Sequence, residues 1–480
     1  MKRFDVVVIG SGPAGQKAAI QSAKAGRSVA VIEQLKEVGG ACVHHGTIPS
    51  KALRERALQH SAFSHRLEEL PVAPELAEVH VAELIGEMGE VIHNHDQYMK
   101  AQLERNGIEI IHARASFIDR HHLEVQETNG ARKRIKSEYI VIATGSTPRM
   151  PENIPIDHEN IYDSDSILSL AYLPESMVVL GGGVIACEYA SVFALLGVKV
   201  TMIDRYPRPL GFLDATLTEH FVSSFEAMGG CFLGETEVLD SCFDGVSSVQ
   251  TRLADGRVVN SEKLLCALGR ISRLDGLKAE DVGVKITDRL LVEVDPQGKT
   301  SVDNIYAAGD VVGPPSLASA SMEQGRRAAC DFLAIDPGCQ GEWTPSGIYA
   351  VPELACVGAT EEQVVSQYGA ALTGCARFNE IARGHIAGSG DGLLKMVASP
   401  DRVVRGVHIV GENATEMIHI AQMGLIQSAT VETYIENVFN FPTYAECFRV
   451  AALQIEKGEA DTVAPVETES QGDLRGGTSA

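Results

Sequence analysis

Apolar runs and amphipathic stretches alternate in a regular order at the start of the chain. Residues 4–9 are almost entirely apolar, and residues 13–25 then show helical spacing with a proline in the first turn. Residues 29–32 form a second apolar run, which Glu33 follows directly. A glycine-rich turn, residues 10–15, separates the first run from the helix. The pattern predicts strand, glycine turn, helix, strand and acid.

The same order returns in the middle of the chain. Residues 177–180 are apolar, three glycines follow, and a helical pattern runs to Leu196. Residues 198–203 form another strand-like run, which ends at Asp204. The third small residue of the turn precedes the acid by 18 positions in both copies. Two copies with matched spacing predict two nucleotide-binding domains of α/β type.

Glycine turns of this kind have a physical use. Glycine permits a tight turn and lets the backbone approach a pyrophosphate, which the N-terminus of the following helix attracts. The acid at the end of the second strand accepts hydrogen bonds from ribose hydroxyls. A turn that only packs is the alternative, but the repeated context disfavours it. The candidate residues are Gly10, Gly12, Pro13, Ala14, Gly15 and Glu33 in the first copy, and Gly181, Gly183, Val184, Ile185 and Asp204 in the second.

The rest of the chain gives weaker signals. Residues 346–455 mix strand and helix patterns, as in 393–397 and 403–410, and predict an α+β domain. From residue 456 the chain is rich in Glu, Thr, Ser, Gly and Pro without periodicity. We expect residues 456–480 to be a disordered tail.

Composition narrows the classes of function. The 480 residues carry a formal net charge of −23, which disfavours nucleic acid and anionic membrane surfaces as partners. We find no apolar stretch of about 18 residues that could span a membrane. The ten cysteines are scattered without a C-x-x-C pair, so we expect neither a disulfide scaffold nor a metal site. The first residues do not resemble a signal peptide, and we expect a cytoplasmic protein.

Residues 39–53, Gly-Gly-Ala-Cys-Val-His-His-Gly-Thr-Ile-Pro-Ser-Lys-Ala-Leu, resemble the active-site segment of the flavoprotein disulfide reductases. The family pattern is G-G-x-C-x-x-x-x-C-x-P-S-K. Further resemblances follow in order at Ala143-Thr144-Gly145, at 267–270 and at 305–310, where Gly309-Asp310 is similar to the flavin-binding Gly-Asp. The resemblance covers residues 4–455. It implies FAD on the first glycine turn, a nicotinamide coenzyme on the second, and a homodimer or higher homo-oligomer through the C-terminal domain.

The sequence pattern and the resemblance together give the expected domain boundaries, and the tail rests on composition alone. They are an FAD-binding domain at 1–155, an NAD(P)-binding domain at 156–272, a return segment completing the FAD domain at 273–345, a dimerisation domain at 346–455 and the tail at 456–480.

Two family residues are replaced. Thr47 stands where the family has its second, flavin-proximal cysteine, and a hydroxyl cannot form a disulfide. Phe441, in Phe-Pro-Thr-Tyr-Ala-Glu ending at Glu446, stands where the family has its acid–base histidine. Both nucleotide turns and Lys51 remain. This combination resembles one branch, the soluble FAD-dependent (Si-specific) pyridine nucleotide transhydrogenases, and 161–168, 315–320 and 439–443 match it further.

The implied reaction is ping-pong hydride transfer between NADPH and NAD+ through flavin N5, by an oxidoreductase that acts on NADH or NADPH. A lysine matching Lys51 lies near N5 in the family and pairs with a glutamate matching Glu188. The implied catalytic positions are Lys51, Glu188, Cys42, Glu446 and Phe441. The implied FAD-binding positions are Gly10, Gly12, Pro13, Ala14, Gly15, Glu33, Gly40, Ala41, Cys42, Lys51, Thr144, Gly145, Gly309, Asp310, Leu317 and Ala318. The implied NAD(P)-binding positions are Gly181, Gly183, Val184, Ile185, Glu188, Asp204, Arg205, Arg208, Gly269 and Arg270.

Alternatives stay open from the residues alone. A reductase of the dihydrolipoyl dehydrogenase type, an NAD(P)H oxidase and a non-enzymatic sensor of the NAD(H) ratio all use the same two nucleotide sites. Cys42 is either a peroxide-reactive thiol or a residue that only packs. Arg205 and Arg208 either bind the 2′-phosphate of NADP(H) or lie in a solvated loop.

Overall fold

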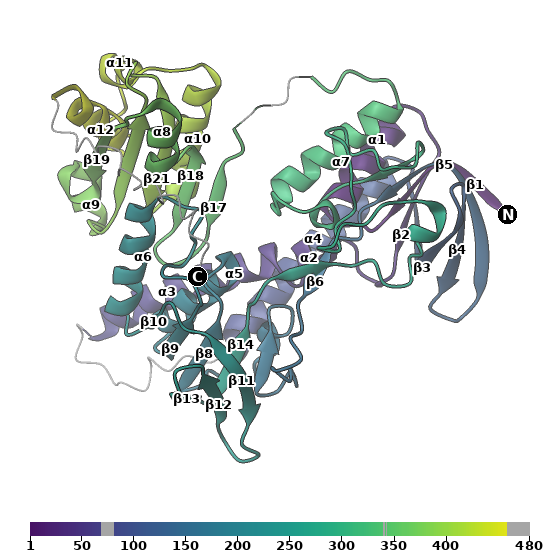
Figure 1. The fold of residues 1–480 in the computed structure, drawn as a ribbon, viewed down its shortest axis with the longest axis horizontal. Coiled ribbons are helices and arrows are strands. Elements are labelled where there is room, and N and C mark those ends of the chain that lie inside the picture. Colours follow the sequence, from purple (N-terminus) through teal and green to yellow (C-terminus); the bar gives the residue numbers. More distant parts are fainter. Residues whose placement is uncertain (69–80, 339–340, 342, 458–480) are drawn as a thin grey trace, which may run out of the picture. The chain divides into compact units, whose positions relative to one another are not determined.

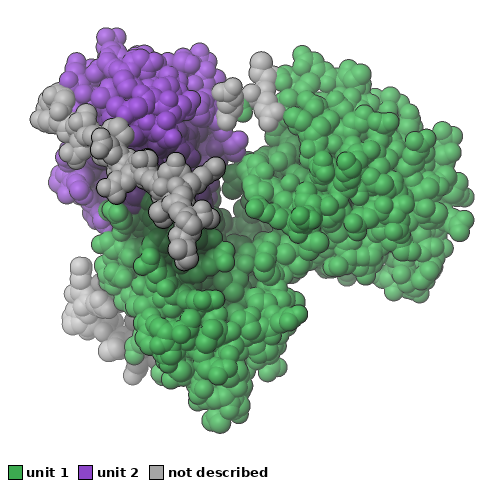
Figure 2. Space-filling view, in the orientation of Figure 1, with its two compact units in different colours: residues 1–211, 218–341, 348–351 green, residues 212–217, 342–347, 352–480 purple. Residues whose placement is uncertain are grey.

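The computed structural model describes residues 1–68, 81–338, 341 and 343–457. It divides into two compact units, coloured separately in Figure 2. Unit 1 comprises residues 1–211, 218–341 and 348–351, and unit 2 comprises residues 212–217, 342–347 and 352–480. Unit 1 contains both glycine turns. The predicted boundary between their two domains, at residues 155 and 156, stays a prediction.

The first sheet of unit 1 carries the first glycine turn (Figure 1). Its parallel strands lie in the order β3, β2, β1, β5, β16, and β4 joins β3 and β5 as an antiparallel meander. The strands are β1 (Lys2–Ile9), β2 (Val29–Glu33), β3 (Glu109–Asp119), β4 (His122–Glu127), β5 (Arg132–Ile142) and β16 (Ile305–Ala307). The helices are α1 (Pro13–Lys24), α2 (Gly40–His44), α3 (Thr47–Glu68), α4 (Val81–Arg105) and α7 (Ala318–Phe332). The central strands β1 and β2 are almost wholly apolar because both of their faces are covered.

The second sheet of unit 1 carries the second glycine turn and is wholly parallel, in the order β10, β9, β8, β14, β7. The strands are β7 (Ile161–Asp163), β8 (Ser176–Leu180), β9 (Lys199–Ile203), β10 (Cys231–Leu233) and β14 (Lys263–Cys266). The helices are α5 (Val184–Leu195) and α6 (Ala215–Ala227), whose first three residues belong to unit 2. Two small sheets complete unit 1, formed by β11 (Val238–Phe243), β12 (Val249–Leu253) and β13 (Val258–Ser261), and by β6 (Ser146–Pro148) with β15 (Arg270–Ser272).

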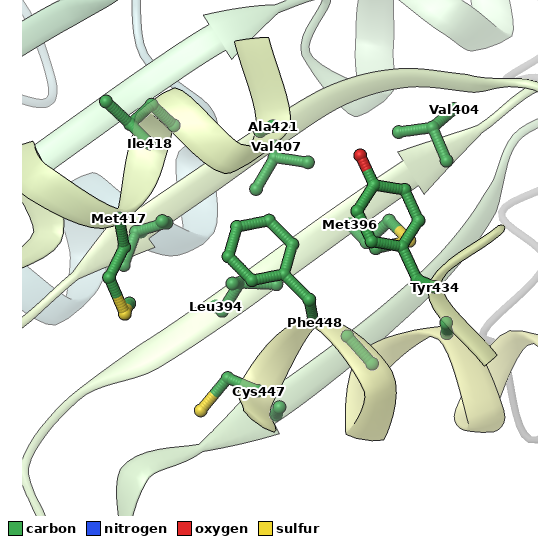
Figure 3. Packing of buried hydrophobic residues seen from close by; sticks show 14 of the residues in the cluster. Leu394, Met396, Val404, Val407, Met417, Ile418, Ala421, Tyr434, Cys447 and Phe448 are labelled. Carbon is green, nitrogen blue, oxygen red and sulfur yellow. The ribbon is translucent and has the colours of Figure 1, made fainter. Parts of the chain in front are cut away.

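Unit 2 is an α+β fold around a five-stranded sheet in the order β17, β18, β21, β20, β19. The strands are β17 (Ser346–Ile348), β18 (Leu354–Gly358), β19 (Leu372–Arg377), β20 (Leu393–Ala398) and β21 (Val404–Val410). The helices are α8 (Glu361–Tyr368), α9 (Ala382–Ala387), α10 (Ala414–Ile426), α11 (Val431–Glu436) and α12 (Glu446–Lys457). Figure 3 shows Phe448 of α12 packed beside Leu394 and Val407 of the sheet.

The observed elements follow the predicted pattern closely. Helix α1 ends at Lys24 and α5 at Leu195, each one residue before the predicted end. The predicted tail from residue 456 begins inside α12, which continues to Lys457, and its remainder lies outside the described residues. Within the described ranges, the structure has no helix that is long and apolar enough to cross a membrane.

Candidate nucleotide and redox site

The first glycine turn is shaped by backbone contacts that only glycine tolerates. Gly10 has a φ of +105°, and a Cβ there would lie 2.2 Å from the carbonyl oxygen of Ala143. Gly15 lies against the carbonyl of Gly10 in the same way. Gly12 is the N-cap of α1 and has open space where its Cβ would be. The first backbone N–H groups of α1 therefore have no side-chain cap. They face an open space, which a side chain at position 12 would partly fill.

The acid of the first copy holds this turn in place. Glu33 is buried, and its Oε2 accepts hydrogen bonds from the backbone N–H and the hydroxyl of Ser11, at 3.0 and 2.6 Å. The Ser11 oxygen in turn accepts a hydrogen bond from the N–H of Gly39. Glu33 thus connects β2 to the turn and to the start of α2. Its predicted hydrogen bond to a ribose stays a prediction.

Several of the predicted FAD residues come together around this turn. A Cβ on Gly40 would lie 3.1 Å from the Cα of Gly12, so two chain segments approach closely through glycine. Gly309 lies beside Ala14, and its N–H donates to Gln324 of α7. The hydroxyl oxygen of Thr144 is buried and lacks a hydrogen-bond partner among the described residues. A close backbone approach, uncapped helical amides and an unpaired hydroxyl fit the pyrophosphate and polar edges of a dinucleotide.

Asp310 and Arg270 belong to one hydrogen-bonded network. The Ser146 hydroxyl donates to Asp310 at 2.7 Å and accepts from Arg270 Nε at 2.9 Å. The other guanidinium nitrogens donate to the Ser146 carbonyl, to Ser164 and to Asp165. Arg270 therefore braces the β6–β15 pair against the start of the second domain. Its predicted coenzyme contact, like that of its neighbour Gly269, stays a prediction.

The second glycine turn repeats the first in detail. Gly181 has a φ of +110°, and a Cβ there would lie 2.7 Å from the carbonyl oxygen of Ala267. Gly183 is the N-cap of α5 and, like Gly12, has open space beside it. Val184 and Ile185 begin the helix. The two copies therefore fold alike, and each presents an uncapped helix N-terminus.

The acid of the second copy lies against its own turn. A Cβ on Gly182 would be 2.4 Å from Asp204 Oδ2, and Asp204 Oδ1 accepts the N–H of Tyr206. Arg205 donates to the Tyr206 hydroxyl at 3.0 Å and lies over its ring. Arg208 differs, because its Nη1 is buried and is unpaired among the residues that the structure describes. Of the two predicted phosphate ligands, Arg208 has the unsatisfied donor.

Lys51 and Glu188, two residues of the predicted site, form a close ion pair. Both carboxylate oxygens of Glu188 lie 2.7 Å from Lys51 Nζ. Lys51 comes from the second turn of α3, and Glu188 comes from α5, so the pair joins the two nucleotide folds. The Glu188 side chain is 7% exposed and that of Lys51 is 27% exposed. The predicted pairing is present in the structure, whereas the catalytic role of the two residues stays a prediction.

Cys42 is the middle residue of α2, and Thr47 is the first residue of α3. Burial raises the pKa of the Cys42 thiol, and the hydrogen bond with Thr47 and the charge of Lys51 offset only part of this rise. The thiol is therefore protonated at neutral pH. His44 Nε2 forms a hydrogen bond with the carbonyl oxygen of Val38, at 2.9 Å. No group of His, Cys, Asp and Glu able to hold a metal ion occurs in the described part of the chain.

Phe441 and Glu446 lie in unit 2. Phe441 is 69% exposed in the loop before α12, and Glu446 begins that helix. Glu446 Oε1 accepts the N–H of Thr443 at 3.0 Å, in the turn that precedes the helix. Leu317 and Ala318, the last predicted FAD residues, form the N-cap and first residue of α7 in unit 1.

Sequence reasoning missed several residues that support the site. Ser11 was visible within the glycine turn, but its hydrogen bonds to Glu33 have no local signature. Tyr349 lies over Lys51, although 298 positions separate the two residues in the sequence. Asp96 accepts the N–H of Val38 from a distant helix. Contacts between distant segments of this kind carry no spacing rule that a single sequence reveals.

Known proteins resemble the whole chain. The family model for pyridine nucleotide-disulphide oxidoreductases matches residues 4–325, and the model for their dimerisation domain matches residues 344–452. A soluble pyridine nucleotide transhydrogenase of Mycobacterium bovis is 40% identical over 460 residues, covering 95% of this chain and 97% of the relative. One of Marinomonas sp. is 37% identical over 459 residues, covering 94% of this chain and 98% of the relative.

A solved structure agrees with the sequence relatives. The crystal structure of LpdA from Mycobacterium tuberculosis superposes with a TM-score of 0.86 at 25% identity, covering 95% of this chain and 100% of that chain. The predicted fold class, two dinucleotide-binding folds with a C-terminal α+β dimerisation domain, is confirmed. With both family models matched in order and relatives at 40% identity along nearly its full length, the chain belongs to the pyridine nucleotide-disulphide oxidoreductases.

Proposed function

We propose that the protein transfers hydride between NADPH and NAD+ with FAD as the bound cofactor, as a Si-specific transhydrogenase. One observation carries the proposal. Thr47 occupies the place of the second redox cysteine, while the Lys51–Glu188 pair beside it is intact at 2.7 Å. A chain without a dithiol keeps a hydride site but loses the relay to a disulfide. Relatives that carry the transhydrogenase name support the same reaction.

The cofactor would be held by the first glycine turn and the segments that meet there. The uncapped amides of α1 would bind the pyrophosphate, and the unpaired hydroxyl of Thr144 would take one of the cofactor's polar groups. Bound FAD would supply the two-electron chemistry that the side chains themselves lack. Glu33 would orient a ribose through the lone pairs left free by Ser11 and Leu35. We propose one tightly bound FAD per subunit.

Lys51 would supply a fixed positive charge next to the reacting groups. A cation held there favours the transition state in which negative charge develops on the acceptor. Glu188 holds the ammonium through both oxygens and is itself almost fully buried, so the pair is oriented before any coenzyme arrives. The role of the protein is therefore orientation and electrostatics.

The second glycine turn would receive the two nicotinamide coenzymes in succession. Asp204 would bind the ribose hydroxyls of NAD(H) but would repel a 2′-phosphate placed directly beside it. The unpaired donor of Arg208 offers the compensating charge for NADP(H). This pairing of an acid with an arginine explains how one site could serve both coenzymes.

The assembly and location form part of the proposal. The family model that matches residues 344–452 is named for dimerisation, and we propose a homodimer or a higher homo-oligomer. We further propose a cytoplasmic protein, where both coenzyme pools are available.

The decisive experiment uses the purified yellow protein with NADPH as donor and thio-NAD+ as acceptor. We expect reduction of thio-NAD+, with dihydrolipoamide and oxygen far poorer partners. Lys51→Ala should retain FAD and lower the turnover strongly, whereas Lys136→Ala, a lysine of β5 outside the site, should not. Turnover of dihydrolipoamide exceeding that of thio-NAD+ would instead assign the protein to the reductases, and binding of both coenzymes without turnover would assign it to sensors.

A further inference from the structure

A four-residue segment, residues 348–351, contacts the Lys51–Glu188 pair although it is distant from both residues in the sequence. Residues 348–351 belong to unit 1, although the residues on either side belong to unit 2. The N–H of Tyr349 donates to Glu188 Oε1 at 2.9 Å, and the N–H of Val351 donates to Ser191 of α5 at 3.0 Å. The carbonyl of Ala350 accepts from Arg54, one turn after Lys51 on α3, at 2.9 Å. The segment is therefore bound to both helices that carry the ion pair.

The side chain of Tyr349 faces the cation of that pair. Lys51 Nζ lies 4.9 Å from the centre of the Tyr349 ring, which is within the range of a cation–π contact. Glu188 contacts the same ammonium through both oxygens. Tyr349 thus contacts both members of the ion pair: its backbone N–H binds the Glu188 carboxylate, and its ring lies against the Lys51 ammonium.

Lysine needs such contacts if its charge is to stay in one place. Its side chain has four rotatable bonds and about 2 kcal/mol of rotamer entropy, and an ion pair alone leaves the ammonium free to pivot about the carboxylate. A ring face on a second side removes part of that freedom, because the negative face of the ring attracts the cation. Residues that fix a charge in this way act on orientation and do not exchange protons.

We propose that Tyr349 is a positioning residue that holds the Lys51 ammonium against Glu188 through the face of its ring. The proposal rests on the proposed function for its consequence, since the positioned charge is the one assigned to hydride transfer. The contact uses the ring face and not the hydroxyl. Tyr349→Phe should therefore preserve it, and Tyr349→Leu should remove it while keeping the backbone hydrogen bond to Glu188.

The first test measures the position of Lys51 without any turnover. Acylation of individual lysines by an N-hydroxysuccinimide ester is followed by peptide mass spectrometry on the holoprotein and on protein stripped of FAD. We expect Tyr349→Leu to raise the acylation rate of Lys51 by about 2- to 30-fold, the range that corresponds to loss of one cation–π contact. Tyr349→Phe should match the wild type. Lys263, which lies over Tyr172, is the internal reference and should not change in either variant.

The second test measures reduction of the bound flavin by NADPH in a stopped-flow instrument. Tyr349→Leu should slow the limiting rate by a similar factor and change the NADPH concentration for half-maximal rate by no more than about twofold. Tyr349→Phe, which keeps the ring, should reduce the flavin at the wild-type rate. The matched control is Tyr368→Leu, which removes a comparable ring from Arg405, 4.8 Å away in unit 2. It should leave the limiting rate unchanged.

The outcomes separate this proposal from the proposed function. Unchanged Lys51 acylation in a folded Tyr349→Leu protein overturns the positioning role, whatever the enzyme catalyses. A Tyr349→Phe protein as impaired as Tyr349→Leu also overturns it, because the hydroxyl would then be the active part. Changed acylation with rescue by phenylalanine supports it even if thio-NAD+ proves not to be reduced, a result that would refute only the proposed function.

Discussion

Burial decides what the Cys42 thiol can do. Its pKa is raised by burial, so the nucleophilic thiolate is scarce at neutral pH, and its neighbour Thr47 offers no second sulfur. The thiol is therefore placed where family members act on disulfides, but without the ionisation or the partner that this chemistry needs. Whether the thiol reacts with peroxide or only packs stays a prediction.

We expect Cys42→Ser to keep most of the NADPH-to-thio-NAD+ activity and to keep its FAD, because hydride transfer between nicotinamides requires no sulfur. Reduction of the wild type should likewise give no thiolate–flavin charge-transfer band. Steady-state kinetics and visible spectra of the wild type, Cys42→Ser and the exposed control Cys231→Ser provide the check. A long-wavelength band in the reduced wild type, or an inactive but flavin-loaded Cys42→Ser, would give the thiol a redox role.

Arg208 and Arg205 differ at the residue scale, although the sequence presents them as equivalent. The guanidinium of Arg205 lies over Tyr206 and donates to its hydroxyl, whereas Arg208 has a buried nitrogen without a partner among the described residues. A buried donor of this kind gains most from a charged ligand, because its desolvation has already occurred.

Arg208→Ala should therefore weaken NADPH binding by about 1.5–3 kcal/mol, or roughly tenfold to a hundredfold, with NADH almost unchanged. Arg205→Ala should have the smaller effect. Dissociation constants of both coenzymes for the two variants measure the difference. Equal losses for NADH and NADPH would show that Arg208 supports the fold of the loop and does not read the 2′-phosphate.

At the scale of an element, the sheet of unit 2 has two unlike faces. One face packs the apolar core of Figure 3. On the other, cross-strand neighbours form a polar row of Cys375, Lys395, His408 and Cys356. Lys395 Nζ lies 2.9 Å from Asp214 and 2.6 Å from Glu361, two carboxylates that reach it from neighbouring segments. The charges are thus paired inside the unit.

His408 makes this row sensitive to acid. Burial lowers the pKa of His408 below its ordinary value of 6.5, and the nearby charges of Asp214 and Glu362 offset only part of this effect, while Lys395 adds to it. Well above pH 6.5 this residue is almost fully neutral in both the folded and the unfolded chain. Below it the unfolded chain binds the proton first, so the free energy of unfolding should fall by up to about 1.4 kcal/mol per pH unit until the folded pKa is reached.

Thermal unfolding of the full chain at pH 7.5 and 5.5 tests the effect. The melting temperature of His408→Gln should fall less than that of the wild type between these two pH values, because glutamine does not titrate. Its side-chain amide can still donate to the Ala359 carbonyl. The exposed His419→Gln should behave like the wild type. If His408→Gln and the wild type lose the same stability on acidification, other groups determine the acid limit.

The sequence predicted some of these elements well and others not at all, for a physical reason. Glycine turns, buried strands and the acids after them are local patterns, so the first strand–turn–helix–strand unit of each nucleotide fold was predictable to within about two residues, whereas the remaining strands of the two sheets were not. The contact of Tyr349 with Lys51 and that of Asp214 with Lys395 join segments far apart in the chain. Pairings of that kind depend on how sheets and helices stack, which no local periodicity encodes.

At the scale of the whole molecule, unit 2 leaves large apolar side chains in water. Val438 is 92% exposed and Phe441 is 69% exposed in the loop between α11 and α12. Apolar groups in that state favour association with a second copy of the chain. The match of this region to a dimerisation domain points to the same use.

We expect the wild type to have the mass of a dimer or larger in light scattering, and Val438→Glu to shift it toward the monomer, because a charge cannot be buried there without a partner. Val246→Glu, at a valine of unit 1 that is 84% exposed, should leave the mass unchanged. An unaltered mass in Val438→Glu would place the interface on another surface.

The strands of the first sheet come from distant parts of the chain, and this affects how the protein folds during its synthesis. Strand β5 ends at Ile142, but the strand that covers its edge, β16, begins only at Ile305. At about 5–20 residues per second, a ribosome needs on the order of ten seconds or more to make the residues between them. During that interval the edge of β5 stands open, a state that invites mispairing with other nascent chains. The second nucleotide fold is thus synthesised before the first can close, and Lys51 meets Tyr349 later still.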